Sequence, residues 1–104
     1  MITVSVLYPN SDGVKFDMDY YLNKHMALLS QRVGSALKGY VVDKGVTGGA
    51  PGSKPTYYVM LHLKFESADA FGKAFGPHAA EIMADIPNYT NVQPVIQISD
   101  PIVS

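Results

Sequence analysis

Four segments of the chain have the side-chain pattern of β-strands. Residues 2–8 alternate apolar and polar side chains and are rich in β-branched residues, while residues 56–65 place apolar residues at every second position. Residues 37–46 and 92–99 are predicted as the two remaining strands. Residues 47–55 are so rich in glycine and proline that they are predicted to form a loop.

Two other segments have the period of an amphipathic helix. The first predicted helix covers residues 18–33, with Asp17 as its N-cap and Gly34 as its end. Ser67 caps the second helix, which breaks at residues 76–77 and continues as a further short helix. Helices at these two places fill the gaps after the first strand and after the third strand.

The order strand–helix–strand–strand–helix–strand predicts the fold class. It is the order of an α+β, ferredoxin-like βαββαβ fold, in which two helices cover one face of a four-stranded antiparallel sheet. A chain of 104 residues has the length of one domain, so we expect residues 1–104 to form a single domain.

The composition suggests that a partner covers the other face of the sheet. Hydrophobic residues make up 47% of the chain and charged residues only 16%. The strand at residues 56–65 is apolar on both faces, because Tyr58 and Met60 lie opposite Val59. An apolar sheet face is too large a patch for a monomer to expose. We therefore predict a homodimer paired through the sheet faces, with Tyr58, Met60 and His62 as interface candidates.

Charge and residue types exclude several classes of function. A net charge of -1 gives no electrostatic basis for binding nucleic acid or an anionic membrane. The lack of cysteine excludes disulfides and thiolate chemistry. The histidine spacings are not those of metal sites, and the glycine-rich stretch 45–52 leads into no helix, so we expect no metal and no cofactor. No apolar run could span a membrane and no signal-peptide pattern is present, so a cytoplasmic location is expected.

His25 is the residue with the most informative position. In a regular helix it lies on one stripe with apolar residues, namely Met18, Leu22, Leu29 and Val33. A buried imidazole needs an internal hydrogen-bond partner or a cavity. His25 is therefore either a satisfied core residue or the polar group of a pocket, and both interpretations remain open.

The pocket hypothesis makes specific expectations. His25 should point inward between the first helix and the sheet, next to a cavity that also touches Tyr8 or Tyr89 and has apolar walls that include Leu22, Met26 and Leu29. Apolar surroundings disfavour the imidazolium, so the ring should be neutral at pH 7. A nearby carboxylate would reverse this expectation, but the acidic residues closest in sequence, Asp17 and Asp19, lie about two helical turns away.

Other polar side chains are weaker candidates for the same pocket. Tyr20 could contribute a hydroxyl group to ligand binding. Tyr8 either presents its phenol to the pocket or simply packs, and His78 is either a surface residue near a helix start or a second imidazole at the pocket mouth. His62 falls on the face assigned to the partner, so it is expected in the interface rather than in the site.

Two phrases of the sequence closely resemble the EthD family. One runs from Tyr8 to His25 and includes Tyr8-Pro9, Phe16-Asp17, Tyr20-Tyr21 and Lys24-His25-Met26. The other is Asp85-Ile86-Pro87-Asn88-Tyr89-Thr90, followed by Pro94-Val95-Ile96-Gln97-Ile98-Ser99. The resemblance covers nearly the whole chain and agrees with the predicted topology.

The resemblance implies a dimeric α/β barrel. The EthD family is similar to small antibiotic-biosynthesis-type monooxygenases, muconolactone isomerases and haem-degrading enzymes, whose subunits pair sheet to sheet. It implies a ligand cleft between sheet and helices and a link to bacterial degradation of alkyl ethers beside a cytochrome monooxygenase. His25 carries over most directly, followed by the region of Tyr89. Because related barrels hold haem through one histidine, that role for His25 also stays open.

Two hypotheses for the function follow. In the first, the protein is a cofactor-independent oxidoreductase, monooxygenase or isomerase that acts on a small hydrophobic, carbonyl or aromatic compound. His25 would be its acid or base, assisted by Tyr8 or Tyr89. In the second, it is a non-catalytic binding or accessory protein that supports a neighbouring monooxygenase.

Overall fold

A four-stranded antiparallel sheet forms one layer of the computed structural model, which describes residues 1–103. The strand order is β2-β3-β1-β4, so β1 and β3 are central and β2 and β4 are the edges. The strands are β1 (Ile2–Pro9), β2 (Gly39–Lys44), β3 (Tyr57–Phe65) and β4 (Val95–Ser99).

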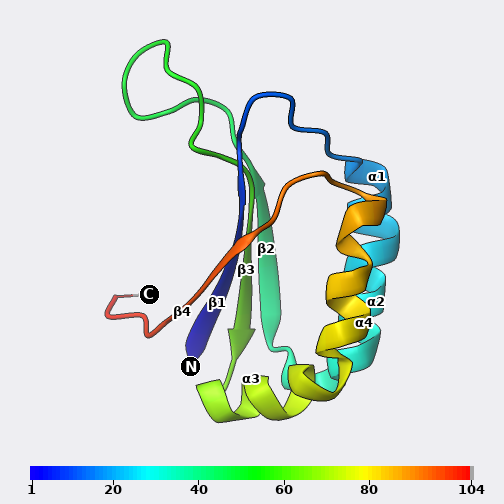
Figure 1. Ribbon diagram of the computed structural model, residues 1–104. Helices are drawn as coiled ribbons and strands as arrows, with labels where there is room; N and C mark the ends of the chain where they lie inside the picture. Colours follow the sequence, from blue (N-terminus) through cyan, green and yellow to red (C-terminus); the bar gives the residue numbers. More distant parts are fainter. Residues whose placement is uncertain (104) are drawn as a thin grey trace.

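Helical segments cover one face of this sheet, as Figure 1 shows, while the loop between β2 and β3 projects from one end. The first group is α1 (Met18–Tyr20), the π-helical turn η1 (Tyr21–His25), α2 (Met26–Val33) and the 3-10 turn η2 (Gly34–Ala36). The second is α3 (Ala68–Phe75), η3 (Gly76–His78), α4 (Ala79–Ala84) and η4 (Ile86–Asn88). The predicted βαββαβ fold class is confirmed.

The helix ends are fixed by the residues that the sequence indicates. The side chain of Asp17 accepts a hydrogen bond from the Tyr20 amide, and Ser67 accepts one from the Ala70 amide, each at 3.0 Å. Gly34 ends α2 with φ 61°, a left-handed conformation that favours glycine.

The π-helical turn changes which side chains of the first helical group are buried. The Met26 amide donates to the Tyr21 carbonyl five residues earlier, so this turn holds one more residue than a turn of α-helix. Tyr21 and Met26 are 0% and 1% exposed, whereas Leu22 is 46% exposed. The expectation that Leu22 lies on the buried stripe is therefore wrong, because it assumed an unbroken α-helical period.

The core lies between the sheet and the helices. The inward face of β3 is almost completely buried and consists of Val59, Leu61, Leu63 and Phe65. At one end, the rings of Phe16, Tyr8, Tyr21 and Tyr89 pack with centroids 5.0–6.0 Å apart. Tyr58 joins this group, since its ring stacks on Phe16 at 5.4 Å. Tyr58 thus packs against the core of its own chain, whereas Met60 and His62 lie on the other face of the sheet.

The other face of the sheet carries no helix and is of mixed polarity. Two hydrogen bonds cross it: one joins Ser5 Oγ and His62 Nδ1 at 2.8 Å, and in the other Lys64 donates to Thr3. Met60 and His62 are half-buried there.

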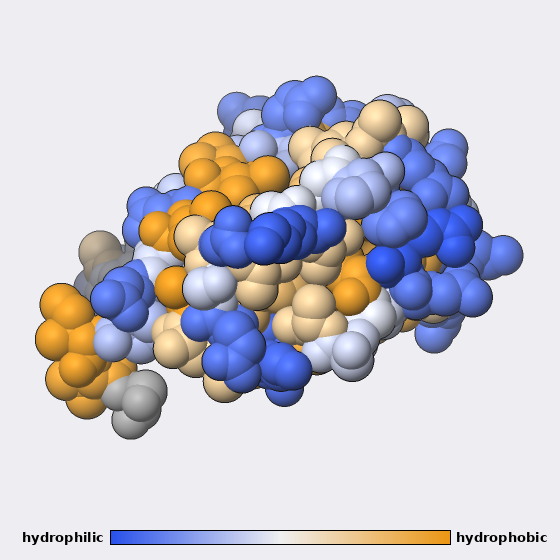
Figure 2. All heavy atoms as spheres, turned by 90° about the horizontal axis from the view of Figure 1, so that it is seen from below, coloured by the Kyte–Doolittle hydropathy of each residue, from blue (hydrophilic) through white to orange (hydrophobic). Residues whose placement is uncertain are grey.

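Apolar side chains are also exposed on the edge strands. Val95, Ile96 and Ile98 of β4 are 51%, 45% and 46% exposed, and Val41 of β2 is 53% exposed. Seen from below, hydrophobic residues gather in separate groups among hydrophilic ones (Figure 2). No helix within residues 1–103 is long and apolar enough to cross a membrane.

Candidate functional site

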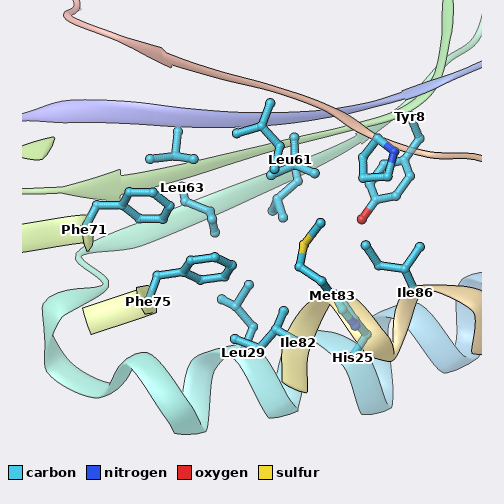
Figure 3. Close-up of a pocket in the computed structure, with 14 residues that line it drawn as sticks. Tyr8, His25, Leu29, Leu61, Leu63, Phe71, Phe75, Ile82, Met83 and Ile86 are labelled. Atoms are coloured by element: carbon cyan, nitrogen blue, oxygen red, sulfur yellow. The ribbon is translucent and has the colours of Figure 1, made fainter. Parts of the chain in front are cut away.

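An apolar cavity opens between the sheet and helices α3 and α4. Phe71 and Phe75, whose rings stack at 5.2 Å, lie at one end, Tyr8 lies at the other, and Met83 lies between them (Figure 3). The empty space between the lining residues, including the part that is open to solvent, is about 420 Å³. The flexible side chain of Met83 borders this space and can turn aside to widen it for a ligand.

The lining of the cavity is almost entirely hydrocarbon. Among the described residues, only Tyr8 and His25 bring hydroxyl or ring nitrogen atoms to it, and no charged side chain lines it. The other lining residues are Val4, Val6, Leu29, Leu61, Leu63, Phe71, Phe75, Ile82, Met83, Ile86, Pro94 and Ile96. Such a wall suits an uncharged, mostly apolar molecule, because an anion would lose its hydration there without a compensating cation.

His25 is the last residue of the π-helical turn and is only 3% exposed. Its Nδ1 lies 2.9 Å from Oδ2 of Asp85, at the C-terminal end of α4. Its ring packs against the rings of Tyr21 and Tyr89, with centroids 5.8 and 4.6 Å away. The imidazole is thus held on three sides.

Asp85 is held in turn by two further donors. The Tyr20 hydroxyl donates to Oδ1 at 2.6 Å, and the Asn88 side-chain amide donates to the same oxygen at 2.9 Å. The two carboxylate oxygens are therefore divided, with Oδ1 accepting from Tyr20 and Asn88 and Oδ2 facing His25. The hydrogen bond to Asp85 also raises the pKa of Tyr20.

Burial and Asp85 act on His25 in opposite directions. Burial lowers the pKa of His25, and the hydrogen bond and charge of Asp85 raise it by less, so its pKa stays below the ordinary value of 6.5. This direction agrees with the expected neutral ring, even though a carboxylate, that of Asp85, lies beside it. Burial raises the pKa of Asp85, yet the hydrogen bonds from Tyr20, Asn88 and His25 outweigh this and its pKa is lowered.

Three buried phenols adjoin His25. The hydroxyls of Tyr8 and Tyr89 are 2.6 Å apart, whereas the hydroxyl of Tyr21 is buried without a hydrogen-bond partner among the described residues. Burial is the main cause that raises the pKa of all three hydroxyl groups. All three are consequently neutral near pH 7 and can donate a hydrogen bond.

The structure brings some of the predicted site residues together at the cavity. His25 and Tyr8 line it, and Tyr89 lies behind them, with its hydroxyl on Tyr8 and its ring on His25. Tyr20 is linked to His25 by hydrogen bonds through Asp85.

Other predicted site residues do not line the cavity. Met26 is buried in the core, Leu22 is exposed and His78 lies in η3. Leu29 of α2 lines the cavity as expected. Most of the other apolar walls come from α3, α4 and the sheet, because these elements face the space while the π-helical turn directs Met26 elsewhere.

Asp85 is the functional candidate that sequence patterns missed. It is 60 residues from His25 and looked like an ordinary residue at a helix end. The available signal was physical: a buried histidine needs a partner, and Asp85 precedes the segment that holds Tyr89.

The described residues fit neither a metal ion nor haem. Within residues 1–103, no three histidine, aspartate or glutamate side chains come together in a way that could hold a metal ion. No cationic side chain among the described residues lines the cavity beside His25 to pair with the carboxylates of haem, so this lining does not fit haem.

Comparisons with known proteins agree with this architecture. The sequence model described as the EthD domain matches residues 14–93, a segment that contains His25, Asp85 and Tyr89. The chain is similar to the crystal structure of an EthD-like protein from Ralstonia eutropha JMP134, with 43% sequence identity and a TM-score of 0.92. That match covers 98% of this chain and 92% of the other. No curated protein matches significantly.

More distant structures share the fold. An ethyl tert-butyl ether d (EthD) family protein from Bacillus halodurans C-125 has 16% identity and a TM-score of 0.65, covering 98% of this chain and 99% of the other. A protein from Bacteroides fragilis NCTC 9343, described as dimeric, of unknown function and ferredoxin-like, has 10% identity and a TM-score of 0.56. That match covers 96% of this chain and 94% of the other.

Proposed function

The chain belongs to the EthD family, and from this premise we propose that it binds a small, uncharged, largely apolar carbonyl compound and removes a proton from it. The observation that carries the proposal is the lining of the cavity. Among the described residues, the hydrocarbon lining is joined by one imidazole, from His25, and one phenol, from Tyr8, and by no charged side chain.

These two groups are suited to proton transfer at a carbon next to a carbonyl. A neutral His25 ring can accept the proton as a general base, because its pKa lies below the ordinary value. With the Tyr89 hydroxyl as the donor in the Tyr8–Tyr89 bond, the hydrogen of the Tyr8 hydroxyl is free to be donated to the carbonyl oxygen as it gains negative charge. Return of the proton to another carbon would complete an isomerisation.

The test uses two probes of matched shape, phenylacetone and phenylacetate. Phenylacetone is an uncharged ketone with an acidic CH₂ group, whereas phenylacetate carries a carboxylate in place of the acetyl group. We expect the protein to bind phenylacetone, to exclude phenylacetate, and to speed exchange of the CH₂ protons for deuterium in D₂O, followed by NMR.

Variants separate binding from chemistry. His25→Gln should reduce exchange roughly a hundred- to ten-thousandfold while binding persists. The control Asp69→Asn changes an exposed carboxylate on α3, which pairs with Lys73 at 3.1 Å, and should alter neither property. Equal binding of phenylacetate, or unchanged exchange in His25→Gln, contradicts the proposal. Binding of phenylacetone without exchange by the unaltered protein would favour a non-catalytic binding protein.

We further propose that the protein acts as a homodimer paired through the open sheet face. The support is the apolar exposure of Val41 and Val95 at the two edges, together with half-buried Met60 at the centre. A standard interface buries about 800 Å² per partner, and we expect the open sheet face to bury a comparable area. The distant relative from Bacteroides fragilis is described as dimeric.

A further inference from the structure

We propose that Asp85 is a positioning residue that holds His25 in the tautomer with hydrogen on Nδ1 and leaves Nε2 to take the ligand's proton. This inference rests on the proposed function of the cavity and deepens it. It names the carboxylate that decides which imidazole nitrogen serves as the base.

The geometry assigns the hydrogen on Nδ1. An ionised carboxylate can only accept hydrogen bonds, and Oδ2 of Asp85 is 2.9 Å from Nδ1. The hydrogen of a neutral ring must then sit on Nδ1, since the tautomer is set by the hydrogen bond that one nitrogen makes.

The second nitrogen is left for the cavity. Nε2 has no hydrogen-bond partner among the described residues, although the ring of His25 lines the cavity. Tyr21 and Tyr89 pack against the imidazole and oppose rotation that would exchange the two nitrogens. A ligand proton would therefore move to Nε2, and the resulting imidazolium would keep its Nδ1 hydrogen bond to Asp85.

The carboxylate is prevented from turning by its other partners. Tyr20 and Asn88 both donate to Oδ1, at 2.6 and 2.9 Å, so Oδ1 cannot turn toward His25 without losing both hydrogen bonds. Asp85 is only 13% exposed, which limits competition from water. Asp85, which follows α4, and Asn88 in η4 thus fix the orientation of the His25 ring, although both are far from η1 in the sequence.

The arrangement makes a sharp prediction for Asp85→Asn. The donors Tyr20 and Asn88 still require an oxygen at the position of Oδ1, so the new amide places its oxygen there. Its NH₂ group then replaces Oδ2 and faces Nδ1 of His25. Because an NH₂ group donates, Nδ1 must accept, and the hydrogen of the neutral ring moves to Nε2.

The experiment is a long-range ¹H–¹⁵N correlation spectrum of the ¹⁵N-histidine protein at pH 7.5, which distinguishes protonated from unprotonated ring nitrogens. His25→Gln identifies the signals of His25. We expect hydrogen on Nδ1 in the unaltered protein and in the control Asp69→Asn, and hydrogen on Nε2 in Asp85→Asn. In Asp85→Asn, deuterium exchange into phenylacetone should fall at least tenfold while binding persists.

The two proposals fail in different ways. A His25 ring that carries hydrogen on Nε2, or on both nitrogens, in the unaltered protein would overturn the role of Asp85 without any ligand. An Asp85→Asn spectrum in which the hydrogen stays on Nδ1 would overturn it as well.

If Asp85→Asn does not fold, Tyr20→Phe provides the second variant, and it should retain the Nδ1 tautomer because the carboxylate remains. Failure of phenylacetone to bind would contradict the proposed function and leave the tautomer result unaffected.

Discussion

The three phenols beside His25 differ in how their hydroxyl groups are satisfied. Tyr8 and Tyr89 bond to each other at 2.6 Å, whereas the Tyr21 hydroxyl is buried without a partner. Burying an unpaired hydroxyl group costs free energy, so Tyr21→Phe should leave the free energy of unfolding unchanged or raise it by up to about 1 kcal/mol. Tyr8→Phe is the matched control. It leaves the Tyr89 hydroxyl without its hydrogen-bond partner and should lower the free energy of unfolding by about 1–3 kcal/mol. Urea unfolding measures both, and a Tyr21→Phe protein less stable than Tyr8→Phe would contradict the prediction.

The lowered pKa of His25 also predicts how stability depends on pH. Between its folded pKa and about 6.5, the unfolded chain binds more protons at this residue than the folded chain does. Stability should therefore fall on acidification from pH 7.5 into this window, by at most about 1.4 kcal/mol per pH unit from this group. His25→Gln should have a flatter profile in urea unfolding between pH 4.5 and 7.5. The lowered pKa of Asp85 acts below about 3.8, where its stabilising contribution is lost, and so lies outside this range.

For single residues, the sequence predicts which side chains belong to the candidate site better than it predicts their hydrogen-bond partners. His25 and Tyr8 were identifiable because one buried polar residue interrupts an apolar stripe and a tyrosine ends the first strand. Asp85 was not, because a hydrogen bond across 60 residues leaves no periodic signal. The functional roles of all three remain predictions.

Among the elements, the first helical group shows what a regular period cannot predict. The start of α1 at Met18 and the end of α2 at Val33 agree with the sequence, because caps are local chemistry. The π-helical turn inside it depends on packing of Tyr21 and Met26 against the core, which no local pattern reports. Leu22 and Met26 were wrongly predicted to form cavity walls because the π-helical turn adds one residue to the helical period.

Two glycines in helical segments should respond oppositely to the same change. Gly34 has φ 61° and ψ −142°, a conformation that is strained for alanine, so Gly34→Ala should lower stability by about 1–3 kcal/mol. Gly72 lies inside α3 with nothing within 4 Å of an added methyl group, so Gly72→Ala should raise stability by about 0.5–1 kcal/mol. Thermal unfolding of both variants checks this, and equal shifts in the same direction would contradict it.

For the whole molecule, the predicted topology is confirmed but the assembly is still a proposal. Alternation and helical period set the order of elements, and the antiparallel sheet follows from it. The sequence also suggested an apolar outer face, yet the structure shows a mixed one, in which Ser5 and His62 pair across the centre. The cytoplasmic location, the substrate and the catalytic activity stay predictions, since they depend on molecules outside this chain.

The proposed dimer can be tested on the open sheet face. Val41→Asp adds a charge to a residue that is 53% exposed and lies in register with His62, so it should convert a dimer to a monomer. Val46→Asp, at a residue 89% exposed in the loop beyond β2, is the control and should leave the mass unchanged. Light scattering at micromolar concentration measures both. A monomeric mass for the unaltered protein would refute the proposal.

The edge position of β4 has a consequence for how the chain behaves outside its folded assembly. Its five residues, Val95-Ile96-Gln97-Ile98-Ser99, carry no charge and present unpaired backbone groups along one side. Short, uncharged, β-prone segments of this kind can template aggregation by joining strands of other chains. Pro94 and Pro101 stand close to its two ends, and proline cannot donate the backbone hydrogen bond that would extend such a stack. The two prolines thus limit the aggregation-prone segment to one short strand while the chain is synthesised or refolds.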